Sequence, residues 1–122
     1  MGDPTGEGFD RRKGPSLFEL ARDLSAGRIS RAELVQQSLD AIEQADGQGR
    51  TAFIRVADDA LDIAQQFDRH PPELRYAGVP ISVKDLFDIQ GQVTTAGSVL
   101  LRDQAPAKQD AAVVRSLRML VL

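Results

Sequence analysis

The sequence predicts a helix-rich part of a domain, in which several helices precede a single strand. Two helix starts are indicated by capping-box pairs, in which a serine is followed three residues later by a glutamate, at Ser16/Glu19 and Ser30/Glu33. The strand is indicated by β-branched residues with alternating polarity at 78–85. Because one strand cannot satisfy its own ladder donors and acceptors, we expect its partners to come from later sequence or from another molecule.

The first two predicted helices carry apolar residues at helical spacing. The first is expected to start after Ser16 and to end at Gly27, since glycine adopts the left-handed conformation that ends many helices. The second is expected to start after Ser30 and to end near Gly47 and Gly49. Their apolar stripes are Leu17, Leu20, Ala21 and Leu24 in the first helix and Leu34, Val35, Leu39 and Ile42 in the second. Two antiparallel helices joined by a tight turn are the simplest arrangement for this pattern.

The next segment predicts one short element and one helix. Residues 51–56 are β-branched or aromatic at several positions and favour a short extended segment, with a helical turn as the alternative for so short a run. Residues 58–69 predict a third helix, because their acidic start suits a helix N-terminus and Pro71-Pro72 prevents continuation.

A loop and a last helix are expected after the strand. Small residues between 91 and 98 suit a close-packed loop. Asp110 is expected to cap the last helix, whose apolar face is made by Val113, Val114, Leu117, Leu120 and Val121.

Composition and charge exclude several classes of function. The chain has 122 residues, and its 18 acidic and 15 basic residues give a formal net charge of −3. It therefore lacks the basic excess that neutralises phosphates, and nucleic acid is not expected as a direct partner. Since it has no cysteine and only one histidine, His70, thiolate and multi-histidine metal sites are excluded, and no cofactor is expected. His70 precedes two prolines and is expected to be a surface residue.

Targeting signals are not expected either. Residues 1–15 are polar and rich in glycine and charge, and they predict a flexible arm without the apolar core of a secretory signal. No stretch approaches the ~18 consecutive apolar residues that a membrane span requires, so we expect a soluble, cytoplasmic protein.

Lys84 is the candidate for chemistry. Side chains alternate along a strand, so Ser82 and Lys84 share one face. If that face is buried, desolvation favours the neutral amine, which can accept a proton from a hydroxyl nucleophile. The competing interpretation is a lysine at a strand edge that extends into solvent. Asp85 would favour the charged ammonium, but alternation directs its side chain to the opposite face. A phosphate-binding loop is excluded, because it requires glycine before the lysine and Ser or Thr after it.

A resemblance to a known family strengthens the case for Lys84. The run from Tyr76 to Asp85 is similar to the Gly-Val-Pro-x-x-Val-Lys-Asp element of amidase signature enzymes, and 94–98 resembles their Thr-x-Gly-Ser run. The segments 29–35, 51–53 and 110–118 are similar to further parts of the family pattern. The matching segments keep the family's order over residues 16–118, which is more specific than any single run.

The resemblance implies an α/β fold, a mixed sheet covered by helices, of which residues 16–122 form an N-terminal fragment. It also implies hydrolysis of a small carboxylic amide by a Ser/cis-Ser/Lys triad, with Lys84 as the lysine. Both family serines lie in a later segment, so Ser82 and Ser98 are not expected to replace them and the chain is expected to be inactive alone. Two alternatives stay open, which are the amidotransferase branch of the family and a non-catalytic fragment that needs a partner chain or self-association to complete its sheet.

Overall fold

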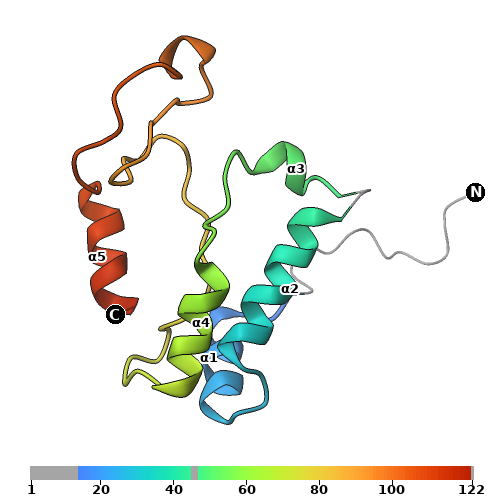
Figure 1. Ribbon diagram of the computed structural model, residues 1–122. Coiled ribbons are helices and arrows are strands. Elements are labelled where there is room, and N and C mark those ends of the chain that lie inside the picture. Colours follow the sequence, from blue (N-terminus) through green and yellow to red (C-terminus); the bar gives the residue numbers. More distant parts are fainter. Residues whose placement is uncertain (1–13, 45–46, 122) are drawn as a thin grey trace, which may run out of the picture.

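The computed structural model describes residues 14–44 and 47–121. The predicted arm at 1–15 lies almost wholly outside these residues. The described elements are helices joined by irregular segments, and they have the following bounds: α1 Leu17–Ser25, α2 Arg31–Glu43, α3 Gly49–Ala52, α4 Ala60–Arg69, the 3-10 helix η1 Val99–Leu101 and α5 Ala112–Val121 (Figure 1).

Both predicted capping boxes are confirmed. At the start of α1 the Glu19 N–H donates to Ser16 Oγ at 3.2 Å, and the Ser16 N–H donates to the Glu19 carboxylate at 2.7 Å. The same reciprocal pair starts α2, with 3.0 and 2.8 Å for Ser30 and Glu33. These bonds satisfy N–H groups that have no partner inside the helix.

The end of α1 at Gly27 is also confirmed. Gly27 has φ +67°, its N–H donates to the Leu24 carbonyl at 3.1 Å, and the Arg28 N–H donates to the Asp23 carbonyl at 2.9 Å. This pair of bonds is the Schellman motif, which turns the chain sharply after a helix.

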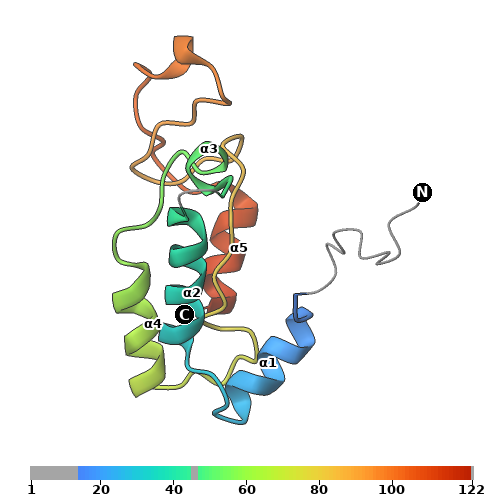
Figure 2. The same ribbon diagram turned by 90° about the vertical axis from the view of Figure 1, so that its right-hand side faces the viewer.

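The arrangement of α1 and α2 differs from the antiparallel pair that the sequence suggests. Figure 2 shows α1 splayed away from α2, which packs against α4. The α2/α4 pair is antiparallel, because Asp68 near the end of α4 accepts the backbone N–H groups of Arg31 and Ala32 at 2.8 and 2.9 Å at the start of α2. A carboxylate from a neighbouring helix thus completes the cap that Ser30 begins.

The third helix is confirmed as α4, whereas the extended segment expected at 51–56 is wrong for Thr51 and Ala52; Phe53 after them has an extended backbone. Thr51 and Ala52 complete the short helix α3, and residues 53–57 have no regular structure. The helical alternative for this run therefore holds for its first two residues.

The predicted strand forms no ladder in the described part of the chain, and the sheet of the implied α/β fold is not seen there. Residues 79–84 rise from the end of the 70–78 loop as a single irregular segment (Figure 1). An isolated strand is unfavourable because its ladder donors and acceptors stay unpaired, and within the described ranges the backbone groups of residues 80–83 bond to no other backbone group.

A buried arginine joins α2 to the loop before this segment. Arg31 is 9% exposed, and its Nε donates to the carbonyl of the fully buried Ala77 at 2.8 Å. Its Nη1 lies 3.9 Å from the Asp68 carboxylate. Gly78 follows with φ +84°, directly against the Arg31 side chain. Arg31 therefore sets where the chain leaves the helical layer and turns toward Lys84.

We expect Gly78→Ala to destabilise the fold more than Gly91→Ala. Both glycines have positive φ, +84° and +81°, which costs an L-residue about 1–2 kcal/mol. At Gly78 an added Cβ would also lie 2.4 Å from Arg31 Cδ, whereas at Gly91 it would meet nothing within 4 Å. Overpacking adds about 1–3 kcal/mol, so urea unfolding should show roughly twice the loss for Gly78→Ala. Equal losses would mean that Arg31 moves aside freely.

Candidate active site

Lys84 lies at the far end of the segment that starts at Gly78. Its side chain is exposed, as is that of Ser82, while Val83 between them is half-buried. The Lys84 carbonyl accepts the N–H groups of Leu86 at 2.7 Å and Phe87 at 3.1 Å, so the chain folds back directly after the lysine. Among the described residues no carboxylate forms an ion pair with Lys84.

Asp85 is engaged by other groups. Its carboxylate oxygens accept the Thr95 N–H at 3.1 and 3.2 Å and also the Thr95 hydroxyl. Arg55 Nη2 lies 3.8 Å from Oδ1, and the Asp85 side chain is 19% exposed. The hydrogen bonds from the Thr95 side chain and backbone lower the pKa of Asp85 below its ordinary value, with smaller contributions from the Gly97 N–H and Arg55.

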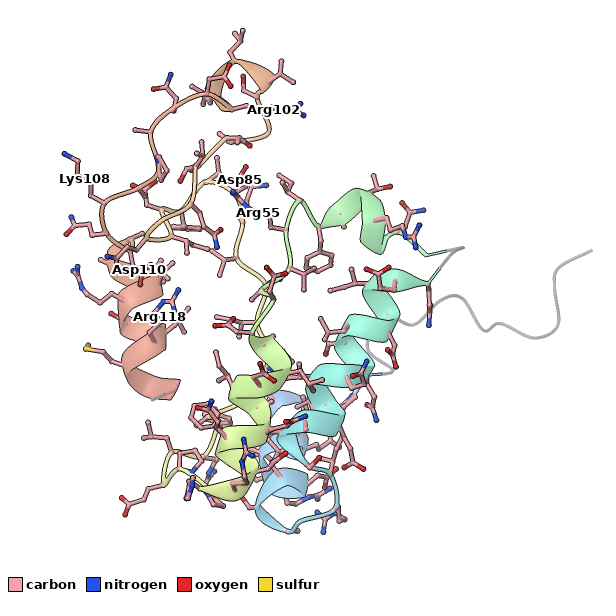
Figure 3. The ribbon with its side chains drawn as sticks, viewed as in Figure 1. Arg55, Asp85, Arg102, Lys108, Asp110 and Arg118 are labelled. Carbon is pink, nitrogen blue, oxygen red and sulfur yellow. The ribbon has the colours of Figure 1, made fainter. Side chains whose placement is uncertain are left out.

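Arg55 ties a third segment to this cluster. Its Nη2 donates to the Val93 carbonyl at 2.7 Å, so one guanidinium contacts both the Asp85 turn and the 93–95 segment (Figure 3). Sequence reasoning missed Arg55 and the role of Thr95. The signal in the sequence was a carboxylate directly after the candidate lysine. Its residue type does not predict which groups it binds.

Two further carboxylates close the loop that follows Lys84. Asp88 accepts the Thr94 hydroxyl at 2.6 Å, and its carbonyl accepts the Ala111 N–H at 2.8 Å. The expected capping role of Asp110 is wrong, because its carboxylate accepts the Gln90 N–H at 2.8 Å and pairs with Arg118 Nε at 2.8 Å (Figure 3). Asp110 thus fixes the start of α5 to the loop.

The segment 94–98 is a loop, as its small residues predict, but it is not closely packed at Gly97, where an added Cβ would meet nothing within 4 Å. Ala96 and Gly97 have φ +49° and +73°, and Ser98 Oγ accepts the Leu100 N–H at 3.3 Å at the start of η1. Ser98 therefore has the loop-shaping contact that the sequence predicts. His70 is exposed and ends α4 as the predicted surface residue.

The face of α5 agrees in part with the prediction. Val114 is buried and Leu117 is half-buried, but Val113 is 46% exposed. The side chains of Leu120 and Val121 lie outside the described set. No helix in the described ranges is both long and apolar enough to cross a membrane, and within those ranges no three His, Cys, Asp or Glu residues are grouped to hold a metal ion.

We expect acid to weaken the contact between Asp85 and the 94–98 loop. Because the folded-state pKa of Asp85 lies below its ordinary value of 3.8, the unfolded chain binds more protons near that pH. The stabilisation is thus complete above 3.8 and is lost as pH falls through the folded pKa. Urea unfolding between pH 6 and pH 2 should show a shallower acid loss for Asp85→Asn than for the unchanged chain; identical pH profiles would contradict the assignment.

Comparison with known proteins places this arrangement in a family. The family model described as Amidase matches residues 33–120, a range that contains Lys84, Asp85 and Thr95. The A subunit of glutamyl-tRNA(Gln) amidotransferase from Chromohalobacter salexigens is 39% identical over 106 residues, covering 84% of this chain and 22% of the relative. The AtzE subunit of 1-carboxybiuret hydrolase from Pseudomonas sp. strain ADP is 33% identical, with 82% of this chain and 23% of the relative covered.

A solved structure is similar to this chain in fold as well as in sequence. It comes from a vestigial protein complex that reveals the evolutionary origins of an s-triazine catabolic enzyme, and it superposes with a TM-score of 0.76 at 32% identity over 88% of this chain and 24% of that one. The chain spans about 22% of the length of the first curated relative, so the likeness concerns that portion alone. The match over residues 33–120, together with these relatives, confirms the predicted family: the chain belongs to the amidase family.

Proposed function

We propose that this chain supplies the catalytic lysine, Lys84, of an enzyme that hydrolyses a small carboxylic amide to an acid and ammonia or an amine. The observation that supports the proposal is the family match over residues 33–120, which contains the Gly-Val-Pro-Ile-Ser-Val-Lys-Asp run. The geometry adds that Lys84 is exposed beside a turn that is anchored by its next residue, Asp85.

In the proposed mechanism, Lys84 acts through a cis-serine to take the proton of a nucleophilic serine. That serine attacks the amide carbonyl, backbone donors hold the tetrahedral intermediate, and the amine leaves before water hydrolyses the acyl-enzyme. Neither serine is assigned to a residue of this chain. We therefore propose that the chain alone is inactive and that the remaining triad members come from the rest of a complete enzyme. We also propose that this enzyme is cytoplasmic and needs no cofactor.

A chimera tests the proposal. This chain would replace the segment of the 1-carboxybiuret hydrolase subunit to which it aligns, in the assembly in which that subunit works. We expect the chimera to consume 1-carboxybiuret and the isolated chain to hydrolyse no amide. Turnover by the isolated chain that Lys84→Ala leaves unchanged would reject the assignment.

A second candidate function is that of a non-catalytic chain that requires a partner chain or a second copy. The observation that favours it is apolar surface without cover, since Ile81, Leu86 and Phe87 around Lys84 are 59, 57 and 45% exposed. An open hollow beside α4 is also lined by apolar side chains, among them Ile63 and Pro80. Size-exclusion chromatography with light scattering distinguishes a monomer from a self-associated form of the chain. A mass of 13.3 kDa at all concentrations contradicts self-association.

The amidotransferase branch is proposed as the variant within the family. Its support is the similarity to the A subunits of glutamyl-tRNA(Gln) amidotransferases, with 39% identity for the Chromohalobacter salexigens protein. A second chimera, in which this chain replaces the aligned segment of that protein, tests this variant. Amidation of glutamyl-tRNA by the chimera would support the amidotransferase branch over amide hydrolysis.

A further inference from the structure

The carboxylate next to Lys84 connects segments that are far apart in the sequence. Asp85 accepts both the N–H and the hydroxyl of Thr95, and Arg55 lies 3.8 Å from the same carboxylate. Arg55 in turn holds the Val93 carbonyl at 2.7 Å. Three segments thus meet at one carboxylate, and each of them is irregular in structure and would be poorly fixed without it.

The backbone that receives Asp85 is shaped for an anion. Ala96 and Gly97 follow Thr95 with φ +49° and +73°, a conformation that an L-residue such as alanine rarely adopts. Successive residues of this kind can direct their N–H groups toward one point and form a concave anion site. Here the N–H groups of Thr95 and Gly97 both act on the Asp85 carboxylate. The anion in this site is the chain's own side chain.

Fixing Asp85 also fixes the main chain of Lys84. The two residues share a peptide plane, and the Lys84 carbonyl is held by the N–H groups of Leu86 and Phe87 at 2.7 and 3.1 Å. These bonds restrain the carbonyl end of Lys84. An amine that relays a proton must be held within hydrogen-bond reach of its partner, so this anchoring is what a relay lysine requires.

We propose that Asp85 is the positioning residue for Lys84, and that Thr95 and Arg55 hold it in place. The inference rests on the proposed catalytic role of Lys84. Asp85 is assigned no contact with substrate. Arg55, which lies before α4 in the sequence, is assigned the role of holding Asp85.

The test is amide hydrogen exchange and ¹⁵N relaxation by NMR on the full 122-residue chain and four variants. Asp85→Asn removes the negative charge that the Thr95 N–H and hydroxyl bind, Thr95→Val removes the hydroxyl bond and keeps the N–H, and Thr95→Ser keeps both donors. Thr94→Val is the matched control, because the neighbouring Thr94 hydroxyl bonds to Asp88 instead, at 2.6 Å. The amides of α2 and α4 report whether the helical layer stays folded.

We expect the amide of residue 95 to exchange about tenfold faster or more in Asp85→Asn, because a hydrogen bond to a charged group contributes a factor of about ten or more. The increase should be smaller in Thr95→Val, which keeps the N–H donor and loses only the hydroxyl bond. The backbone order parameter at Lys84 should fall in the same two variants and return in Thr95→Ser. Thr94→Val should leave Lys84 unchanged. A carboxylate that only stabilises the loop would alter exchange at Thr95 without altering the order at Lys84.

The proposal is overturned if Lys84 stays as ordered in Asp85→Asn as in the unchanged chain, or if Thr94→Val disorders it equally. Should Asp85→Asn also unfold α2 and α4, Thr95→Val decides the question, because it leaves the Asp85 charge and Arg55 in place. None of these measurements needs turnover. A failure of Lys84→Ala to affect the chimera would reject the proposed function while leaving the positioning result intact.

Discussion

Lys84→Ala in the chimera with the 1-carboxybiuret hydrolase subunit is expected to lower kcat by about 10³-fold or more. General acid–base catalysis by one positioned group contributes about 10²–10⁴-fold, and loss of one member of a cooperative triad removes most of the triad's effect. Lys84→Arg should not restore activity, because a guanidinium stays protonated and cannot accept the proton of a hydroxyl. The measurement is initial-rate kinetics at saturating substrate.

Lys108→Ala provides the matched control for the loss of a positive charge. Lys108 lies in the irregular stretch between η1 and α5, and Figure 3 shows it away from Arg55 and Asp85. We expect kcat to change by less than about twofold in this variant, as is usual for surface substitutions. Equal losses in the two variants would mean that Lys84 contributes only charge and not a proton relay.

Arg31→Met is expected to lower the free energy of unfolding by about 3 kcal/mol. A hydrogen bond to a charged group contributes about 1.5–3 kcal/mol, and a buried carbonyl without a donor costs about 1–3 kcal/mol. Both terms apply, since Arg31 Nε donates to the carbonyl of Ala77, which has no solvent exposure. Methionine keeps much of the volume against Gly78, so a cavity adds little. Urea unfolding followed by circular dichroism measures the change.

Arg28→Met is the control for this prediction. Arg28 bonds to Asp23 at 2.6 Å, but its side chain is 55% exposed. An exposed ion pair contributes about 0–1 kcal/mol, so the control should stay within that range. If Arg31→Met costs no more than Arg28→Met, the 77–78 turn does not depend on Arg31.

Several helix boundaries were accessible from sequence, because the interactions that set them are local. The end of the second helix near Gly47 and Gly49 was predicted wrongly, since α2 ends at Glu43 and Gly49 begins α3. The capping boxes at Ser16 and Ser30 and the Schellman turn at Gly27 join groups within five positions of each other. Such short-range bonds depend on residue types at fixed offsets, which a sequence displays directly. The Pro71-Pro72 pair ends α4 for the same kind of reason, since proline cannot continue a helix.

The identity of the candidate lysine also came from sequence, through the run that ends in Lys84 and Asp85, and the family it implied is confirmed by the match over 33–120. Its catalytic role stays a proposal. The strand expected around it is not seen in the described residues. Alternating polarity indicates only that a segment can be extended. Whether it forms a ladder depends on a neighbouring segment, which the pattern does not contain.

By itself, then, the sequence determined the family, the starts of α1 and α2, the ends of α1 and α4, and the candidate lysine Lys84. Only the tertiary structure decided what surrounds them. Arg31 and Ala77 are 46 positions apart and Arg55 and Val93 are 38 apart, and Asp110 accepts the N–H of Gln90, 20 positions away, rather than an N–H of the first turn of α5. A carboxylate or guanidinium can satisfy its hydrogen bonds with many partners, and the chain path alone selects which of them lie within reach.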